Sequence, residues 1–188
     1  MKKGFFFAAF LSAQVAFAAD CPPAESLDFE GIHLGADKES ILKIFPTLEI
    51  SQEQKDITLD FDSGKVPSGF SEFRYGNIHF NKEGKVSYIY FNYNIEFLDK
   101  PAEMLKDSII NKFNLPSKEW ISKPIYDKKT MKAAGYDPRS KQTTLKCKDY
   151  YIKVTQDFDI GKGAMGARLQ INYPEEEKWI FLINYDYL

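Results

Sequence analysis

Two cysteines, Cys21 and Cys147, have the chemistry that is simplest to assign in this 188-residue chain. An even number of cysteines in an exported protein favours a disulfide. A bond between them would close a loop of about 127 residues, and loss of chain entropy in the unfolded state gives roughly 4–5 kcal/mol of stabilisation for a loop of this length. A redox or catalytic thiol is the alternative, but the chain has no C-x-x-C motif. We therefore predict a structural disulfide that joins the N-terminus to the C-terminal half.

Aspartates occur in two similar motifs that could hold a metal ion or transfer protons. Residues 60–65 and 157–162 both read Asp-Phe-Asp-x-Gly-Lys. A calcium-binding EF-hand loop also opens with Asp-x-Asp, but the glutamate that it needs at position 12 is Ser71 in one motif and Arg168 in the other. Asp56 shares one side of a predicted strand with Asp60 and Asp62. A solvated strand face is the favoured interpretation, and a carboxylate acid–base pair is the alternative.

The two histidines do not form a recognisable catalytic pattern. His33 and His79 have no evident link to either cysteine, and no nucleophile elbow, zinc-protease helix or phosphate-binding loop occurs in the chain. We expect both to be surface or interstrand residues. We therefore predict no catalytic residue, no metal and no cofactor, and expect the protein not to be an enzyme.

Aromatic residues are the most distinctive part of the composition, at 15% of the chain. Tyr88 and Tyr90 share one side of a predicted strand, and Phe73 and Tyr75 are placed to lie opposite them across a hairpin. Tyrosine and tryptophan dominate the contacts that carry binding energy in protein interfaces. The four residues are therefore candidates for binding a partner. The alternative is that tyrosine serves here only as a good strand former.

Charge is divided between two parts of the chain. Residues 20–62 carry a balance of -8 and residues 112–148 a balance of +7, within a chain of formal charge -2 and pI about 5.8. The two parts could attract each other, or the basic stretch could be a solvated loop. It could also bind an anionic partner. Nucleic acid is not expected. The basic candidates for partner binding are Lys128, Lys129, Lys132 and Arg139.

The first eighteen residues have the features of a secretory signal peptide. Lys2 and Lys3 precede an apolar stretch that ends in Ala16-Phe17-Ala18, a small-x-small cleavage site. Removing residues 1–18 would leave 23 basic and 27 acidic side chains, a formal charge of -4. Asp20 comes directly before Cys21, so a lipid anchor on that cysteine is not expected. We predict a bacterial protein of the periplasm or the external medium, with no transmembrane anchor after cleavage.

The remaining chain, residues 19–188, is predicted to be a single α+β domain. Asp37 and Asp99 could each cap a helix, over 37–45 and 101–113. Hairpin-length links between the strands favour an antiparallel sheet with the two short helices packed on one face. This order leaves open a tandem helix-plus-sheet repeat. The predicted strands span 56–62, 70–80, 85–95, 143–147, 150–157, 167–173 and 179–187, with an irregular stretch at 117–141 and a glycine turn at 161–166.

Residues Gly31 to Pro46 resemble a motif of exported proteins. The motif is a glycine, a short apolar strand, a second glycine at Gly35, a capping residue at Asp37 and a short helix that ends near proline. It is similar to the start of the small helix–sheet module shared by outer-membrane assembly lipoproteins and the β-lactamase inhibitor protein. The resemblance implies a tandem helix-plus-sheet layout whose second unit starts near Asp99. It also implies a binding module of the cell envelope.

Three functions are compatible with these features. The leading hypothesis is an exported, non-enzymatic binding protein of the bacterial cell envelope, inhibitor-like or immunity-like, whose partner is another envelope or secreted protein. The second is a periplasmic protein that binds a small ligand or lipid between sheet and helices. The third is a hydrolase whose site is assembled from scattered carboxylates.

Overall fold

The computed structural model describes residues 20–45, 55–61, 70–94, 96, 100–125, 139–159 and 163–175. Several expectations lie outside these ranges. They are the signal peptide at 1–18, the Asp99 cap, the basic candidates Lys128, Lys129 and Lys132, and the strand at 179–187.

Two α-helices, one 3₁₀ turn and seven strands make up the described chain. The turn is η1 (Ala24–Ser26), and the helices are α1 (Lys38–Ile44) and α2 (Ala102–Phe113). The strands are β1 (Asp56–Asp60), β2 (Phe73–Phe80), β3 (Val86–Tyr93), β4 (Ile121–Pro124), β5 (Lys141–Lys146), β6 (Tyr151–Asp159) and β7 (Gly163–Asn172).

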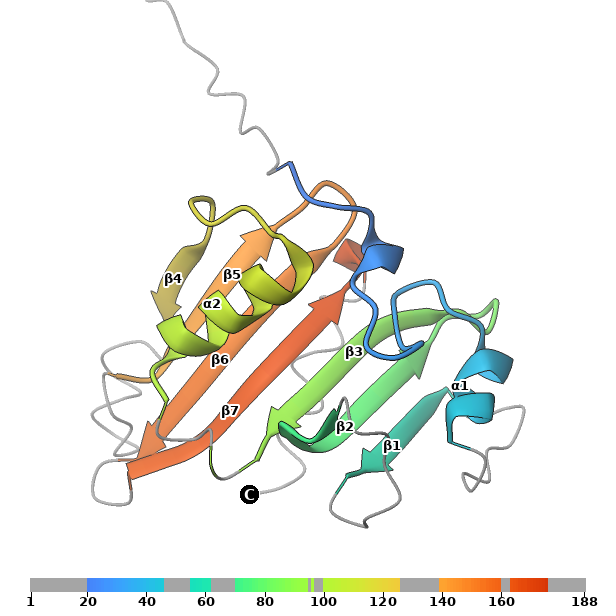
Figure 1. The fold of residues 1–188 in the computed structure, drawn as a ribbon, viewed down its shortest axis with the longest axis horizontal. Coiled ribbons are helices and arrows are strands. Elements are labelled where there is room, and N and C mark those ends of the chain that lie inside the picture. The colour runs from blue at the N-terminus through green and yellow to red at the C-terminus, as the bar shows by residue number, and fades with distance from the viewer. Residues whose placement is uncertain are drawn as a thin grey trace, which may run out of the picture.

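The seven strands form one antiparallel sheet in the order β1-β2-β3-β7-β6-β5-β4. Strands that follow one another in the chain are antiparallel neighbours in the pairs β1–β2, β2–β3, β5–β6 and β6–β7, the pattern that hairpins produce. The N-terminal strands β1–β3 and the C-terminal strands β4–β7 join where β3 pairs with β7. Figure 1 shows α2 lying across β5 and β6. The prediction of an α+β fold with an antiparallel sheet is confirmed.

Alternating residues of every long strand build the hydrophobic core on one face of the sheet. Side chains of successive residues point to opposite faces of a strand, so the pairing register aligns apolar residues in rows. α1 adds Ile41 to the same core cluster, and α2 adds Leu105 and Ile109. One continuous row crosses six strands through Ile57, Ile78, Ile89, Ile171, Ile152 and Leu145, all of them at most 1% exposed.

Phenylalanines fill the part of the core that lies over β2 and β3. Phe91 packs 4.7 Å from Phe73 and 5.2 Å from Phe29, measured between ring centroids, and Phe29 contacts Phe113 of α2 at 4.9 Å. Gly76 makes room for Phe91, because a β-carbon at position 76 would lie 2.6 Å from the Phe91 ring. Edge-to-face and offset ring contacts add stabilisation beyond the apolar area that they bury.

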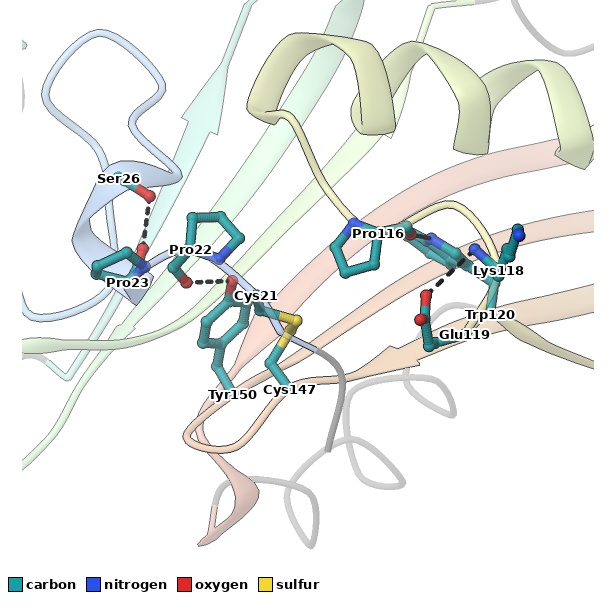
Figure 2. The surroundings of a disulfide bond; sticks show 10 residues. All are labelled: Cys21, Pro22, Pro23, Ser26, Pro116, Lys118, Glu119, Trp120, Cys147 and Tyr150. Atoms are coloured by element: carbon teal, nitrogen blue, oxygen red, sulfur yellow. Dashed lines mark hydrogen bonds between the residues drawn. A yellow bond between two sulfur atoms is a disulfide. The ribbon is translucent and has the colours of Figure 1, made fainter. Parts of the chain in front are cut away.

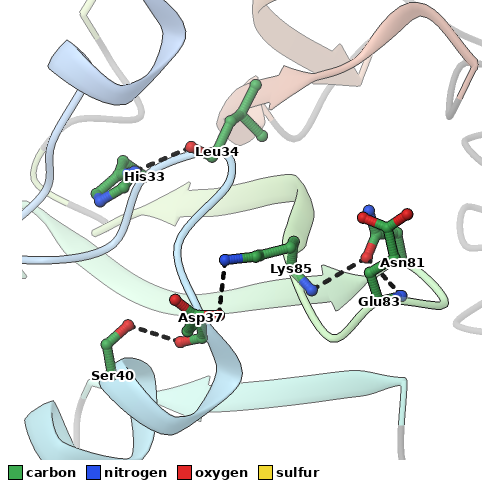
Figure 3. Close-up of polar contacts among 7 residues, drawn as sticks. All are labelled: His33, Leu34, Asp37, Ser40, Asn81, Glu83 and Lys85. Carbon is green, nitrogen blue, oxygen red and sulfur yellow. Dashed lines mark hydrogen bonds and ion pairs between the residues drawn. The ribbon is translucent and has the colours of Figure 1, made fainter.

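The turn between β2 and β3 is fixed by the predicted hairpin residues (Figure 3). Asn81 Oδ1 accepts hydrogen bonds from the backbone N–H groups of Glu83 and Lys85, both at 3.0 Å. Gly84 has a φ of 73°, which is favourable only for glycine. The hairpin and its positive-φ glycine are therefore confirmed.

The segment before α1 attaches to this hairpin. The Gly35 N–H donates to Val86 O at 2.8 Å, and the Val86 N–H donates to Ala36 O at 2.9 Å. Asp37 is the N-cap residue of α1, as predicted, but its side chain makes no capping hydrogen bond. Its carboxylate binds Lys85 Nζ at 2.7 Å instead (Figure 3). The Asp37 carboxylate therefore pairs with Lys85, which follows the β2–β3 turn, and not with the N–H groups of α1.

The disulfide between Cys21 and Cys147 is present, with Cα atoms 5.7 Å apart and a sequence separation of 126. Figure 2 shows Tyr150 beside it, with its hydroxyl donating to Pro22 O at 2.8 Å. The Cys147 N–H donates to Tyr150 O at 2.9 Å, which closes the turn between β5 and β6. Burial raises the pKa of Tyr150 to about 12, so the phenol remains a donor at neutral pH. The disulfide thus fixes the N-terminal segment to the end of the β5–β6 hairpin.

Two local predictions are wrong. β4 lies inside the stretch that was expected to be irregular, because its residues gain hydrogen bonds from the free edge of β5. Of the glycines expected in the turn between 150–157 and 167–173, Gly163 and Gly166 belong to β7 instead, where Gly166 pairs with Asp157. Gly161 lies outside the described residues. A register shift between Asp157 and Phe158 lets this hairpin run further than alternation alone predicts.

Candidate interaction surface

The face of the sheet opposite the core carries polar and tyrosine side chains, and we call it the tyrosine face. Register places these residues in cross-strand rows. One row runs through Asp56, His79, Tyr88, Asn172, Tyr151 and Lys146, the next through Thr58, Asn77, Tyr90, Gln170, Lys153 and Thr144, and a third through Tyr75, Asn92, Arg168, Thr155 and Gln142.

Three tyrosines form a connected group on this face. The rings of Tyr88 and Tyr90 are stacked with centroids 6.5 Å apart, and Tyr75 lies 6.3 Å from Tyr90. The group runs from a buried to an exposed position, since Tyr88 is 6% exposed and Tyr75 is 36% exposed. Rigid strands hold the rings, so a partner that contacts Tyr75 would meet a preformed aromatic surface.

Burial sets the protonation state of the two inner tyrosines. Desolvation raises the pKa of Tyr88 and Tyr90 above the ordinary tyrosine value, and the nearby Arg168 guanidinium opposes part of that rise. Both phenols are therefore neutral at physiological pH. In this state they can donate hydrogen bonds.

Arg168 forms an ion pair with the Asp157 carboxylate on the same face. Asp157 is 6% exposed, and its Oδ1 atom has no hydrogen-bond partner. Desolvation raises the pKa of Asp157, and Arg168 lowers it by a smaller amount. The aspartate motif at 157–162 therefore supplies a partner for an arginine.

Both histidine rings have a polar contact within the described residues. His79 is on the tyrosine face, where its Nδ1 lies 2.7 Å from Asp56 Oδ1 at the paired position of β1. His33 Nδ1 lies 2.9 Å from Leu34 O, as Figure 3 shows. No group of three or more His, Cys, Asp or Glu side chains in the described residues is placed to hold a metal ion.

Phe73 does not belong to the candidate surface, and that prediction is wrong. Its side chain is 1% exposed and packs in the core between Phe91 and Tyr93. Phe73 and Tyr75 are two residues apart, so regular alternation would place them on the same face. The register shift between them pairs Phe73 with Tyr93 and Tyr75 with Asn92, which makes Arg74 an extra residue. This bulge sends the two rings to opposite faces.

Arg139 is the described member of the basic candidates. It is exposed, and its guanidinium carbon lies 4.7 Å from the centroid of the Phe158 ring. It lies two residues before β5, and the strands β3, β7 and β6 separate β5 from β2 in the sheet. The structure therefore does not bring Arg139 together with Tyr75.

The polar residues of β7 that lie beside the tyrosines were not predicted from the sequence. Arg168, Gln170 and Asn172 alternate with Leu169 and Ile171, and this period of two is the signal that could have placed them on one face. Gln170 Nε2 donates to Asn172 Oδ1 at 3.0 Å. Their position beside Tyr88 and Tyr90 depends on the pairing of β3 with β7, which joins residues about eighty positions apart.

Comparison of the chain with protein-family models, curated proteins and solved structures finds no match. The resemblance of residues 31–46 to the envelope helix–sheet module therefore stays a prediction. None of the helices in the described ranges is both long and apolar enough to span a bilayer.

Proposed function

We propose that this protein is an exported, non-enzymatic binding protein of the bacterial cell envelope, and that its partner is another envelope or secreted protein. The observation that carries the proposal is the tyrosine group, in which the exposed Tyr75 is backed by Tyr90 on rigid strands. Aromatic anchors surrounded by polar side chains are characteristic of the energetically important parts of protein interfaces.

The polar surroundings of the tyrosines also favour a protein partner. Asn77 and Asn92 are half-buried at positions next to Tyr75 in the sheet, and Arg168 of β7 is paired with Asn92. His79 is half-buried further along β2 on the same face. Such side chains can form hydrogen bonds at the rim of an interface. The disulfide agrees with export, since such bonds persist in oxidising compartments. The signal peptide expected at 1–18 would direct the export.

A pair of matched variants tests the proposal. Tyr75→Ser removes the exposed ring, whereas Met104→Ser removes an exposed apolar side chain from α2 on the opposite side of the sheet; Met104 is 55% exposed. Wild-type protein and both variants are immobilised and incubated with envelope extract of the source bacterium, and bound proteins are quantified by mass spectrometry.

We expect one protein to bind stoichiometrically to wild type and to Met104→Ser, and to bind about thirtyfold more weakly to Tyr75→Ser, the loss that corresponds to about 2 kcal/mol at a hot-spot residue. Equal retention by all three proteins would contradict the assignment of the surface. Turnover of a substrate that vanishes in a single Asp→Asn variant would contradict the non-enzymatic part.

We also infer that the chain consists of two helix-plus-sheet units with their helices on one face. α1 precedes β1, β2 and β3, and α2 precedes β5, β6 and β7, with β4 as an addition. The mirrored strand order about the β3–β7 pair supports this repeat. An experimental structure tests it: residues 38–93 should superpose on 102–172 with helix and strands matched, and a mismatch in strand order or helix side would contradict it.

A further inference from the structure

The strand β4 forms one edge of the described sheet. It pairs with β5 on one side, and Figure 1 shows it at the outer margin of the fold. All four of its residues are exposed, and the large apolar side chain of Ile121 is 49% exposed. An edge strand offers backbone N–H and C=O groups to another strand, and an exposed apolar side chain on it favours such pairing.

The pairing with β5 determines which backbone groups of β4 point outward. The Ile125 N–H donates to Ser140 O at 3.3 Å, in register with the pairs of β4 and β5. Every second residue of an antiparallel strand bonds to a given neighbour, so the odd-numbered residues of β4 direct their backbone groups toward β5. The even-numbered residues Ser122 and Pro124 therefore direct theirs away from β5. Pro124 has no N–H to donate.

We propose that two copies of this protein associate by antiparallel pairing of their β4 strands, with Ile121 of one copy opposite Ile121 of the other. The outward backbone groups of Trp120 in each copy then exchange hydrogen bonds with those of Ser122 in the other. Ile121 occupies the non-hydrogen-bonded position between them, where opposed side chains lie closest. The contact is two-fold symmetric, as in most homodimers.

Charge complementarity favours this register and a second copy as the occupant. Glu119 and Lys123 are both exposed, and they lie two residues before and two residues after Ile121. In extended strands, each Glu119 would lie opposite Lys123 of the other copy, so an ion pair flanks the apolar contact on both sides. The Glu119 carboxylate accepts the Lys118 N–H at 3.2 Å through one of its two oxygens. A register shifted by two residues would instead place Ile121 opposite a charged side chain.

Lysine and proline on an edge strand usually act against pairing. In the proposed register Lys123 meets an acidic side chain, and Pro124 lies beyond the residues that exchange hydrogen bonds. The opposite edge strand, β1, offers no comparable contact, because its apolar residues Ile57 and Leu59 are only 1% and 2% exposed. Self-association is therefore assigned to β4.

The contact is small, so the dimer should be weak and concentration-dependent. Edge-to-edge pairing would make one sheet of the two copies and place both tyrosine faces on the same side. Two Tyr75 rings could then bind a repetitive or dimeric partner together, and the gain in avidity would need no new contact. The inference itself does not depend on the proposed function, because it rests on residues of another strand.

Cysteine cross-linking in the full chain tests the register. Ile121→Cys places two thiols at a non-hydrogen-bonded pair, where Cα atoms lie about 4.5 Å apart and a disulfide can form. Lys123→Cys is the matched control on the same strand, because positions 123 of the two copies would be roughly 14 Å apart along the strands. Both purified proteins are oxidised with diamide, and linked dimer is measured on non-reducing gels.

We expect Ile121→Cys to form linked dimer about tenfold faster than Lys123→Cys, because only the first pair satisfies disulfide geometry. Mass spectrometry should find the link between the two peptides that contain position 121. Equal rates, or no linked dimer from Ile121→Cys, would overturn the proposal. In envelope extract, a mixed disulfide with a different protein that forms in place of the dimer would also overturn it, since the occupant would then not be a second copy.

Sedimentation equilibrium measures the association without a covalent link. Wild type should show a reversible equilibrium between monomer and dimer. Glu119→Lys puts like charges opposite each other at both ion-pair positions and should weaken the dimer about tenfold. Glu119→Lys/Lys123→Glu restores opposite charges and should restore the association.

Both positions are exposed, so circular dichroism should show the wild-type fold in each charge variant. Wild type that stays monomeric at every concentration would contradict the dimer. Unchanged association in Glu119→Lys, or no recovery in the double variant, would contradict the register. If a charge variant fails to fold, the cross-linking result decides.

Discussion

At the scale of single residues, the tyrosines of one sheet face differ in their exposure to solvent. Tyr75 and Tyr88 have the same chemistry and both lie on the tyrosine face, but only Tyr75 is exposed. Tyr88 lies on β3, in the middle of the sheet, whereas Tyr75 lies on β2, one strand from the edge. Aromatic type alone therefore does not identify a binding residue.

This difference predicts unequal losses of stability. Tyr88→Ser should reduce the free energy of unfolding by about 3–5 kcal/mol, as for other buried aromatic truncations. Tyr75→Ser should change it by less than about 1 kcal/mol, because most of its ring is already in contact with water or a half-exposed neighbour. Urea denaturation monitored by circular dichroism measures both. Equal losses would show that the two rings have similar environments.

Asp157 predicts a pH dependence whose sign follows from its burial. Its folded-state pKa is raised, mainly by desolvation, so the folded state binds the proton more tightly than the unfolded chain. The stabilisation from this proton is fully present below the ordinary aspartate pKa and is lost as pH rises through the folded-state value.

The free energy of unfolding of wild type relative to Asp157→Asn should therefore increase as pH falls from about 7 to about 4, near the ordinary aspartate value. Urea titrations at several pH values measure it, with Asp149→Asn as the control for loss of an exposed carboxyl group. A difference that shrinks on acidification would mean that the ion pair with Arg168 outweighs desolvation.

At the scale of elements, the β2–β3 hairpin depends on two glycines with different roles. Gly84 provides a positive φ in open space, since a β-carbon at this position would meet no other atom within 4 Å. Gly76 provides space, because a β-carbon there would meet the Phe91 ring at 2.6 Å and Tyr90 O at 3.1 Å.

Gly76→Ala should cost about 3 kcal/mol, at the upper end for overpacking, since one neighbour is backbone and cannot move away. Gly84→Ala should cost about 1–2 kcal/mol from left-handed backbone alone. Adding Phe91→Leu should reduce the cost of Gly76→Ala but leave that of Gly84→Ala unchanged. A double-mutant cycle measures this coupling, and additive effects at position 76 would contradict the steric explanation.

Element prediction succeeded where the signal is local and failed where it is not. The alternation in β2 and β3 and the Asn81–Gly84 turn are contained within some twenty residues, and they predicted the hairpin correctly. The bulge at Arg74 has no such signal, and it reversed the orientation of Phe73. β4 has one strongly apolar residue, Ile121, so only its pairing with β5 identifies it as a strand.

In the candidate surface, too, the residues with a local sequence signal could be predicted and the others could not. The shared face of Tyr75, Tyr88 and Tyr90 could be predicted because their spacing is visible within one hairpin, but the burial of Tyr88 could not. Arg168 was missed as a neighbour because its place beside Tyr90 requires the β3–β7 pairing. Long-range register depends on the whole core, which a local pattern does not contain.

At the scale of the whole molecule, the disulfide is a covalent cross-link between residues that are far apart in the sequence. It joins Cys21 to Cys147 across 126 positions, so the unfolded chain loses more conformational freedom than it would with a short loop. The same bond holds the segment that leads into η1 against the β5–β6 turn (Figure 2).

Cys21→Ser/Cys147→Ser should lower the free energy of unfolding by about 4–5 kcal/mol. Urea denaturation of the oxidised wild type and the double variant measures it, and thiol labelling of the unfolded wild type under non-reducing conditions should find no free cysteine. Reduced wild type should match the double variant. A loss below about 1 kcal/mol would contradict an entropic role, since strain would then cancel the constraint.

The central position of β7 has a consequence for the order of assembly. The last strand of the described chain lies between β3 and β6, so β1, β2 and β3 present an unpaired inner edge until residues 163–172 have been synthesised. Such an edge is a template for pairing with other chains. A nascent or prematurely ended polypeptide that stops before Gly163 is therefore the form of this protein most prone to aggregate, and a chaperone that shields β3 would protect it.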